Sequence, residues 1–203
     1  MFRPILSRAL PLALAGLLAT ASVASAQLAR GFTQDPSAAP SGGYSLDKSH
    51  TSVTAQVVHL GLSNFSMRLK GVAGALTYNA KDPTLSKVEV AIDPSSVDTG
   101  SPALDQEVTQ AFKGSPIRFV STGIERTGPT SGKLSGDLTF NGVTKPVVLD
   151  AKFNGTGGGA GGAHARVGFS ATGAIKRSDF GFTAFSTWAG DDVVLHIETE
   201  FSQ

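Results

Sequence analysis

The stretch KLSGDLTFNGVTKPVVLDAKF, residues 133–153, decides the fold class. Apolar or small residues alternate with polar ones on both sides of Asn141-Gly142. A period of two residues places alternate side chains on opposite faces of a strand, and Asn-Gly favours the tight turn of a hairpin. The stretch therefore predicts two antiparallel strands that share one apolar and one polar face.

The same alternation recurs along most of the chain. It is found in the segments 53–59, 65–70, 72–78, 87–92, 117–119, 167–175 and 193–198. About eight strands with one apolar face must close into a barrel or stack as a sandwich, and closure also removes exposed edges. Only residues 103–112 (ALDQEVTQAF) are compatible with a helix, and it is a short one. The predicted fold class is therefore all-β.

The composition argues against several classes of protein. The chain has 24 Gly in 203 residues, and because Gly destabilises helix interiors, a helix bundle is disfavoured. The absence of Cys excludes disulfides, thiolate metal sites, cysteine nucleophiles and a lipid-modified N-terminal cysteine. A formal net charge of +1 provides no basic surface of the kind that binds nucleic acid, so we expect no nucleic-acid partner.

The first 43 residues are predicted to lie outside the folded domain. Arg3 and Arg8, the short apolar run 9–19 and the small-x-small motif Ala24-Ser25-Ala26 have the pattern of a secretory signal peptide. We expect residues 1–26 to be cleaved after Ala26 and the protein to be periplasmic, with an uncleaved N-terminal anchor as the alternative. Residues 27–43, rich in Pro, Gly, Ser and Ala, predict a flexible linker before a domain over residues 44–203. No other long apolar stretch follows, which predicts no stable membrane insertion.

Motifs of known catalytic chemistry are absent from the sequence. It contains neither a G-x-S-x-G nucleophile elbow nor an H-E-x-x-H zinc motif, and none of its four His has metal-ligand spacing to another. Residues 157–162 match G-x-G-x-x-G by letter, but an alternating strand follows instead of the helix that a pyrophosphate site requires. We therefore predict no catalytic residues, no metal and no cofactor. An Asp47–His50 pair that modifies a lipid is a distant alternative, which requires both side chains to face a pocket.

Small residues occupy many positions on the apolar face. They are Ala55, Gly74, Gly136, Ala151, Ala171 and Gly173. Two interpretations stand, because small residues either leave room for a ligand inside a barrel or only relieve crowding where strands coil. His59, which shares the parity of Val57, is likewise either a polar group at the barrel rim or a structural hydrogen-bonding group at a strand end.

The segment 176–188 carries two further features. Phe182, Phe185 and Trp188, together with Phe112 of the helical segment, either line a pocket mouth or cap an open barrel end. Lys176-Arg177 beside Asp179 is typical of a solvated turn with a weak local ion pair.

Seven segments, in order, resemble the YceI-like, polyisoprenoid-binding family. They are residues 44–47 with His50, 59–61, 96–100, 119–122, 136–147 (GDLTFNGVTKPV), 177–181 (RSDFG) and 191–198. The resemblance covers residues 44 to 201 and implies an extended, lipocalin-like eight-stranded antiparallel β-barrel with a short capping helix. It also implies a long apolar channel for an isoprenoid or other long-chain lipid, and export to the periplasm. It brings no catalytic residue set and is compatible with a homodimer.

The chain departs from the pattern of that family at three places. The family usually has Phe where this chain has Ala55 and often has Gly where it has Met67. The segment 101–115 is shorter than its counterpart, with matches only at Asp105 and Phe112. Because this segment caps the pocket in the family, we expect a different mouth. Since Ala55 enlarges one part of the channel and Met67 fills another, we expect a ligand preference that differs from a typical polyisoprenoid.

These observations predict a periplasmic binding or carrier protein for a polyisoprenoid or another long-chain amphiphile, such as a prenyl quinone, a fatty acid or a fatty amide. Burial of the ligand would supply affinity at about 25 cal/mol per Å² of apolar surface. The residues expected to line the channel are Val53, Ala55, Val57, Phe65, Met67, Leu69, Leu76, Val90, Phe112, Phe119, Leu138, Phe140, Phe169, Phe182 and Trp188. His59 and Arg118 are expected to form a polar rim that sets the head group. The alternative is a ligand-free periplasmic stress-response or interaction module with a packed barrel core.

Overall fold

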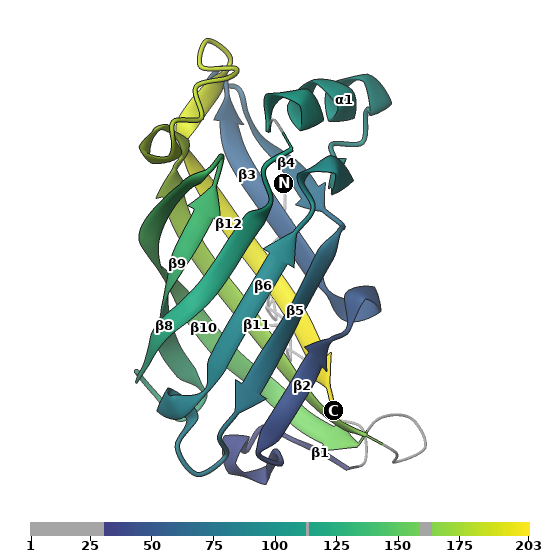
Figure 1. Ribbon diagram of the computed structural model, residues 1–203, viewed down its shortest axis with the longest axis vertical. Helices are drawn as coiled ribbons and strands as arrows, with labels where there is room; N and C mark the ends of the chain where they lie inside the picture. The colour runs from purple at the N-terminus through teal and green to yellow at the C-terminus, as the bar shows by residue number, and fades with distance from the viewer. Residues whose placement is uncertain (1–30, 113, 159–163) are drawn as a thin grey trace, which may run out of the picture.

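The computed structural model describes residues 31–112, 114–158 and 164–203, and the strands in this part of the chain form one antiparallel barrel (Figure 1). The strands are β1 (Phe32–Thr33), β2 (Gly42–Leu46), β3 (Ser52–His59), β4 (Ser63–Leu69), β5 (Val72–Tyr78), β6 (Lys87–Ile92), β7 (Val97–Asp98), β8 (Ile117–Arg126), β9 (Ser131–Phe140), β10 (Val143–Gly158), β11 (Ala165–Lys176) and β12 (Ala189–Ser202). The helices are α1 (Pro102–Ala111) and the short 3-10 helices η1 (Pro36–Ala38), η2 (Lys48–His50), η3 (Pro83–Leu85), η4 (Pro94–Ser96) and η5 (Arg177–Phe180). The expected signal peptide lies outside the described residues.

Eight long strands make up the barrel wall, because three pairs of short strands are halves of longer ones. β12 pairs with β2 at Phe201↔Leu46 and with β3 at Ile197↔Val53, so β2 and β3 form one strand that η2 interrupts. β4 with β5, and β6 with β7, are related in the same way. β8 to β12 follow in sequence order, and β12 closes the barrel against the β2–β3 strand. The predicted all-β barrel is confirmed.

The breaks in the β4–β5 and β6–β7 strands lie side by side and determine where α1 packs. Lys70 N donates to Ser96 O at 3.2 Å, and Asp93 N donates to Gly71 O at 2.9 Å. Gly71 is required here, because a Cβ atom would lie only 2.8 Å from the Cβ atom of Ser96. Beyond the break β7 stays with β4, and α1 packs beside β7 at the upper end of the barrel (Figure 1). The short helix predicted over 103–112 is confirmed, and no helix among the described residues has the length and apolar character needed to cross a membrane.

The Asn-Gly hairpin forms as predicted between β9 and β10. Asn141 and Gly142 have φ angles of 51° and 77°, the left-handed values that a tight hairpin turn requires. The side chain of Asn141 also donates from Nδ2 to Phe180 O at 3.0 Å, which ties the turn to η5. Along the two strands the alternation buries Leu138 and leaves Val148 on the outer face.

Two aromatic clusters lie at opposite ends of the barrel interior. The upper cluster consists of Phe112, Phe140, Phe180 and Phe182, whose neighbouring ring centroids are 5.2–5.7 Å apart. The lower cluster consists of Tyr44, Tyr78, Phe153, Phe169 and Phe201, with neighbouring centroids 5.5–6.4 Å apart. Aromatic pairs at such distances each contribute about 0.5–1.5 kcal/mol beyond the burial of their area.

The flexible linker predicted over residues 27–43 is wrong for the part that the structure describes. β1 pairs with β10 through Phe32↔Gly157, and Ala39 is 1% exposed. The hydroxyl of Tyr78 donates to Pro36 O at 2.8 Å, so the segment is fastened to the lower end of the barrel. The sequence shows no periodic pattern here because isolated residues of the segment contact the barrel, whereas a strand or helix would present a continuous apolar face. The folded unit begins before Tyr44.

Candidate functional site

The barrel encloses a cavity of about 340 Å³. Its presence is visible in the burial pattern of β12, where Val193, Leu195 and Ile197 line the cavity yet remain partly accessible. A close-packed interior would bury such inward-facing side chains fully. The barrel between the two aromatic clusters is therefore hollow.

Thirteen of the fifteen apolar residues predicted to line the channel lie on the cavity wall. They are Val53, Ala55, Val57, Met67, Leu69, Leu76, Val90, Phe112, Phe119, Leu138, Phe140, Phe169 and Phe182. Phe65 is not part of the wall, although it pairs across β3–β4 with Val57, which is. Trp188 is also off the wall and is 56% exposed, because the chain reverses at Phe185, whose φ is 61°.

Some of the small residues on the apolar face leave space inside the barrel, and others only relieve crowding between strands. Ala55, Ala151 and Ala171 line the cavity, so their short side chains leave room inside the barrel. The glycines instead permit close packing. A Cβ atom on Gly173 would lie 2.5 Å from Leu149 Cδ2, and one on Gly136 would overlap the ring of Phe119.

Arg177 is buried at the upper end of the cavity and holds the loop that closes it. It is 6% exposed, and its guanidinium donates to the carbonyl oxygens of Gly190 at 2.8 Å, Ala189 at 2.7 Å and Ala184. The solvated turn predicted here is wrong for Arg177, because three backbone carbonyls replace the water that a buried cation loses. The loop that Arg177 holds carries Phe182 and Phe185, which line the cavity.

The polar rim predicted at His59 and Arg118 does not border the cavity. Arg118 alternates with Ile117 and Phe119, which face inward, so its side chain faces outward. There it is 58% exposed and pairs with Glu89 at 2.9 Å. His59 opposes Ser63 at the end of β3, outside the cavity wall.

Apart from Arg177, Ser86 and Thr199, the Arg, Lys, Ser and Thr side chains on the wall lie around the turn between β8 and β9. Arg126, Thr130 and Ser131 flank this turn, and Lys152 opposes Ser131 across the β9–β10 pair. Sequence reasoning missed this group because it followed the apolar face. The available signal was Gly128-Pro129, a turn between two alternating segments that is bordered by a basic residue.

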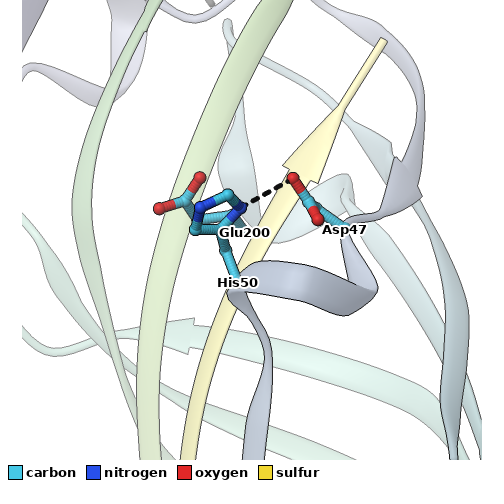
Figure 2. Close-up of side chains that lie close together, drawn as sticks. All are labelled: Asp47, His50 and Glu200. Carbon is cyan, nitrogen blue, oxygen red and sulfur yellow. Dashed lines mark hydrogen bonds and ion pairs between the residues drawn. The ribbon is translucent and has the colours of Figure 1, made fainter.

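A charged cluster of Asp47, His50, Arg166 and Glu200 lies outside the cavity wall. Figure 2 shows Asp47 and His50 at η2 beside Glu200 of β12, with a 2.9 Å contact between His50 Nδ1 and Asp47 Oδ2. Arg166 Nη1 lies 2.7 Å from Asp47 Oδ2 and 3.1 Å from Glu200 Oε2. The guanidinium therefore already supplies the positive charge that a metal ion would bring to these carboxylates.

The pKa values in this cluster move in the directions expected of ion pairs. The hydrogen bonds from His50 and then Arg166 lower the pKa of Asp47 well below its usual range. The bond to Asp47 in turn raises the pKa of His50 above its ordinary value. Neither Asp47 nor His50 lies on the wall of the cavity. The enzymatic alternative required both side chains to face a pocket.

Comparison with known proteins agrees with this architecture. A family model described as "YceI-like domain" matches residues 44–201. A UPF0312 protein of Serratia proteamaculans is 38% identical over 164 residues, which cover 77% of this chain and 84% of the relative. The crystal structure of the YceI protein of Campylobacter jejuni is 32% identical and superposes with a TM-score of 0.63 over 72% of this chain and 89% of that one.

A more distant structure shares the fold alone. A polyisoprenoid-binding domain from Saccharophagus degradans is 14% identical and has a TM-score of 0.56 over 78% of this chain and 97% of its own. The family match covers most of the chain, and the Serratia relative is well above 30% identical over most of its own length. The chain therefore belongs to the YceI-like family.

Proposed function

We propose that this protein is a periplasmic carrier that binds one long-chain amphiphile, a polyisoprenoid or another lipid with a long apolar tail, inside the barrel. The observation that carries the proposal is the hollow, apolar interior of about 340 Å³. Ligand pockets of proteins typically measure about 300–1,000 Å³ and are lined mainly by apolar side chains. A ligand-free module with a packed core would not contain a cavity of this size.

The wall matches a hydrocarbon chain better than a polar ligand. Between the aromatic clusters the inward positions carry Val, Leu, Ile, Ala and Phe, as at Leu138 and Phe119. Each buried methylene of a ligand contributes about 0.8 kcal/mol, while an unpaired polar group loses its hydration. The head group then lies at the lower end, among Arg126, Ser131 and Lys152. The polyisoprenoid-binding domain of Saccharophagus degradans, which shares the fold, supports the same ligand class.

The remaining parts of the proposal follow from the sequence. The N-terminal pattern supports export with cleavage after Ala26, which N-terminal sequencing of the exported protein tests. We assign no catalytic role and no cofactor other than the bound lipid. Whether two copies associate is measured by sedimentation of the purified protein.

The proposal is tested by organic extraction of the purified protein and mass spectrometry of the extract, followed by reloading with a prenyl quinone or a fatty amide. We expect a long-chain lipid in the extract. Leu138→Asp should abolish reloading, because it places a charge on the apolar wall. Val148→Asp is the matched control on the same hairpin, since Val148 is 54% exposed on the outer face and should leave binding intact.

A second variant separates loss of binding from loss of folding. Ala55→Phe fills the cavity with an apolar ring and adds no buried charge, so the barrel should stay folded by circular dichroism and take up less lipid. A lipid-free extract together with no uptake by the wild-type protein would contradict the carrier function. Equal uptake by the wild-type and Ala55→Phe proteins would place the ligand outside the barrel.

A further inference from the structure

Two adjacent loops at the upper end of the barrel present an exposed apolar surface. We call this surface the tip, and it consists of Val58, Leu60, Leu62 and Trp188. Leu62 is 82% exposed and Trp188 is 56% exposed, while Val58 and Leu60 are about half exposed. Leu60 N donates to Trp188 O at 2.9 Å, which joins the β3–β4 turn to the loop that leads into β12 (Figure 1). The tip is thus one surface, built from segments far apart in the sequence.

The backbone holds the tip in a conformation that bulky residues rarely adopt. Among the described residues, three that are not glycine have positive φ: Asn141, Leu60 at 54° and Phe185 at 61°. Asparagine tolerates this conformation, whereas a bulky residue such as leucine or phenylalanine is an outlier there. The Leu60-Gly61 turn is of the kind at which Asn-Gly is favoured. Leu60 is thus an exposed apolar residue at a position where its backbone conformation is unfavourable, and such outliers often mark functional sites.

The four side chains of the tip carry no charge, which limits the kinds of partner that the tip can bind. Residues 57–67 and 180–190 contain no Asp, Glu, Lys or Arg, and the residues beside the tip are mainly Gly, Ser, Thr and Asn, together with His59 between Val58 and Leu60. Tryptophan is enriched at membrane–water interfaces, and Trp, Phe and Leu form the inserted face of segments that lie at the level of the lipid head groups. A stable protein–protein interface needs about 800 Å² and 20–30 residues on each partner, far more than four protruding side chains provide. A fluid bilayer accommodates a small protrusion without a matching surface.

The loop that carries Trp188 also faces the cavity. Phe182 and Phe185 line the cavity, and Trp188 N donates to Phe185 O at 2.9 Å three residues later on the outer side. We propose that the tip docks on a phospholipid bilayer, with Leu60, Leu62 and Trp188 inserted at the level of the head groups. The upper end of the barrel is then the end that meets the membrane. This interaction goes beyond the carrier function, because it does not require a bound lipid.

Trp188 is the only tryptophan of the chain, so its fluorescence reports on the tip directly. The experiment uses the protein recovered after export, with its N-terminus determined by mass spectrometry, and unilamellar vesicles of palmitoyl-oleoyl phosphatidylcholine. We expect the emission of Trp188 to shift to shorter wavelength as vesicles are added. Leu62→Ser should weaken the vesicle affinity about tenfold, the loss expected for one inserted leucine. Leu85→Ser is the matched control, since Leu85 is 63% exposed on η3 at the opposite end of the barrel and should leave the affinity unchanged.

Several outcomes would overturn the docking proposal. They are an absence of vesicle binding by the wild-type protein, an equal loss of affinity in Leu62→Ser and Leu85→Ser, and a Trp188 shift that rises with protein concentration without vesicles. The last outcome would identify self-association. Binding that disappears at high salt or requires anionic phosphatidylglycerol would also contradict it, because the tip carries no charge to be screened. Lipid extraction reports on the interior and vesicle binding on the tip, so failure of one is distinguishable from failure of the other.

Discussion

Single residues decide whether the barrel interior is filled or hollow. Ala55 and Ala171 border open space, whereas Gly136 and Gly173 allow neighbouring side chains to approach the backbone. Each of these residues is in step with the inward-facing residues of its own strand, so the alternation places all of them on the inner face. It does not show which of them leave space for a ligand and which only allow close packing. The difference depends on which side chain of the adjacent strand lies beside the small residue, and this is determined by strand pairing in the folded barrel.

Replacing Gly136 with Ala should destabilise the protein by about 1–3 kcal/mol, because overpacking forces neighbouring groups to move. The added methyl group would overlap the ring of Phe119 and lie 2.7 Å from Val120 O. Urea unfolding followed by circular dichroism measures the change. Gly123→Ala is the matched control in the neighbouring strand, because no atom lies within 4 Å of its Cβ position. A similar loss of stability in both variants would argue against the crowding explanation.

His50 should make the stability depend on pH. The hydrogen bond to Asp47 raises the pKa of His50 in the folded protein, so the protonated imidazole is favoured by folding. This contribution is fully present below the unfolded pKa, about 6.5, and disappears as the pH rises through the folded pKa. The free energy of unfolding of the wild-type protein should therefore fall relative to that of His50→Gln as the pH rises above about 6.5.

The partner of His50 provides the control for that measurement. In Asp47→Asn the main cause of the raised pKa is removed, so the pKa of His50, followed by NMR of its ring protons, should move down toward the ordinary value. A pKa of His50 that is the same in the wild-type and Asp47→Asn proteins would contradict the assigned cause.

Among the elements, α1 is one whose helical structure the local sequence predicts but whose position it does not. The segment 103–112 is compatible with a helix because it lacks the period-two alternation, and α1 occupies Pro102–Ala111. Its docking position was not predictable, because it depends on the break between β6 and β7. Val108 and Phe112 then reach the cavity wall from outside the sheet. A helix that belongs to no strand pair takes its place from tertiary packing alone.

Asp105→Ala should loosen α1. The carboxylate atom Oδ1 of Asp105 accepts from Thr99 N at 2.7 Å and from Thr99 Oγ1 at 2.7 Å, which fastens the first turn of the helix to the preceding segment. Loss of two hydrogen bonds at about 1 kcal/mol each should raise amide exchange in the helix about tenfold or more. Hydrogen exchange with mass spectrometry of the α1 peptide measures this. Glu107→Ala, an exposed change in the same helix, should have little effect, and equal exchange in the two variants would show that the contact does not hold α1.

For the whole molecule, the period-two pattern predicted the strands and their inward faces but left a barrel and a sandwich open, and the closed barrel with an apolar channel was implied by the family resemblance. Most of the expected lining residues then lie on the cavity wall, because one face of every long strand turns inward. Most failures lie where the chain leaves that pattern, and Arg118 is the exception, because the alternation of β8 itself turns its side chain outward. Phe65, His59 and Trp188 stand near strand ends or in a loop, where parity no longer fixes direction. The burial of Arg177 depends on carbonyl groups of Ala184, Ala189 and Gly190, which only the path of the folded loop brings together.

The pairing of β12 also determines which parts of the chain must be present before the barrel can close. The last strand, 14 residues ending at Ser202, is hydrogen-bonded to β11 on one side and to both β2 and β3 on the other. A nascent chain that ends before Ala189 therefore has two open sheet edges and cannot shut its interior. Closure of the barrel therefore requires the β2–β3 strand and β12 together, so the strands between them cannot complete the wall on their own.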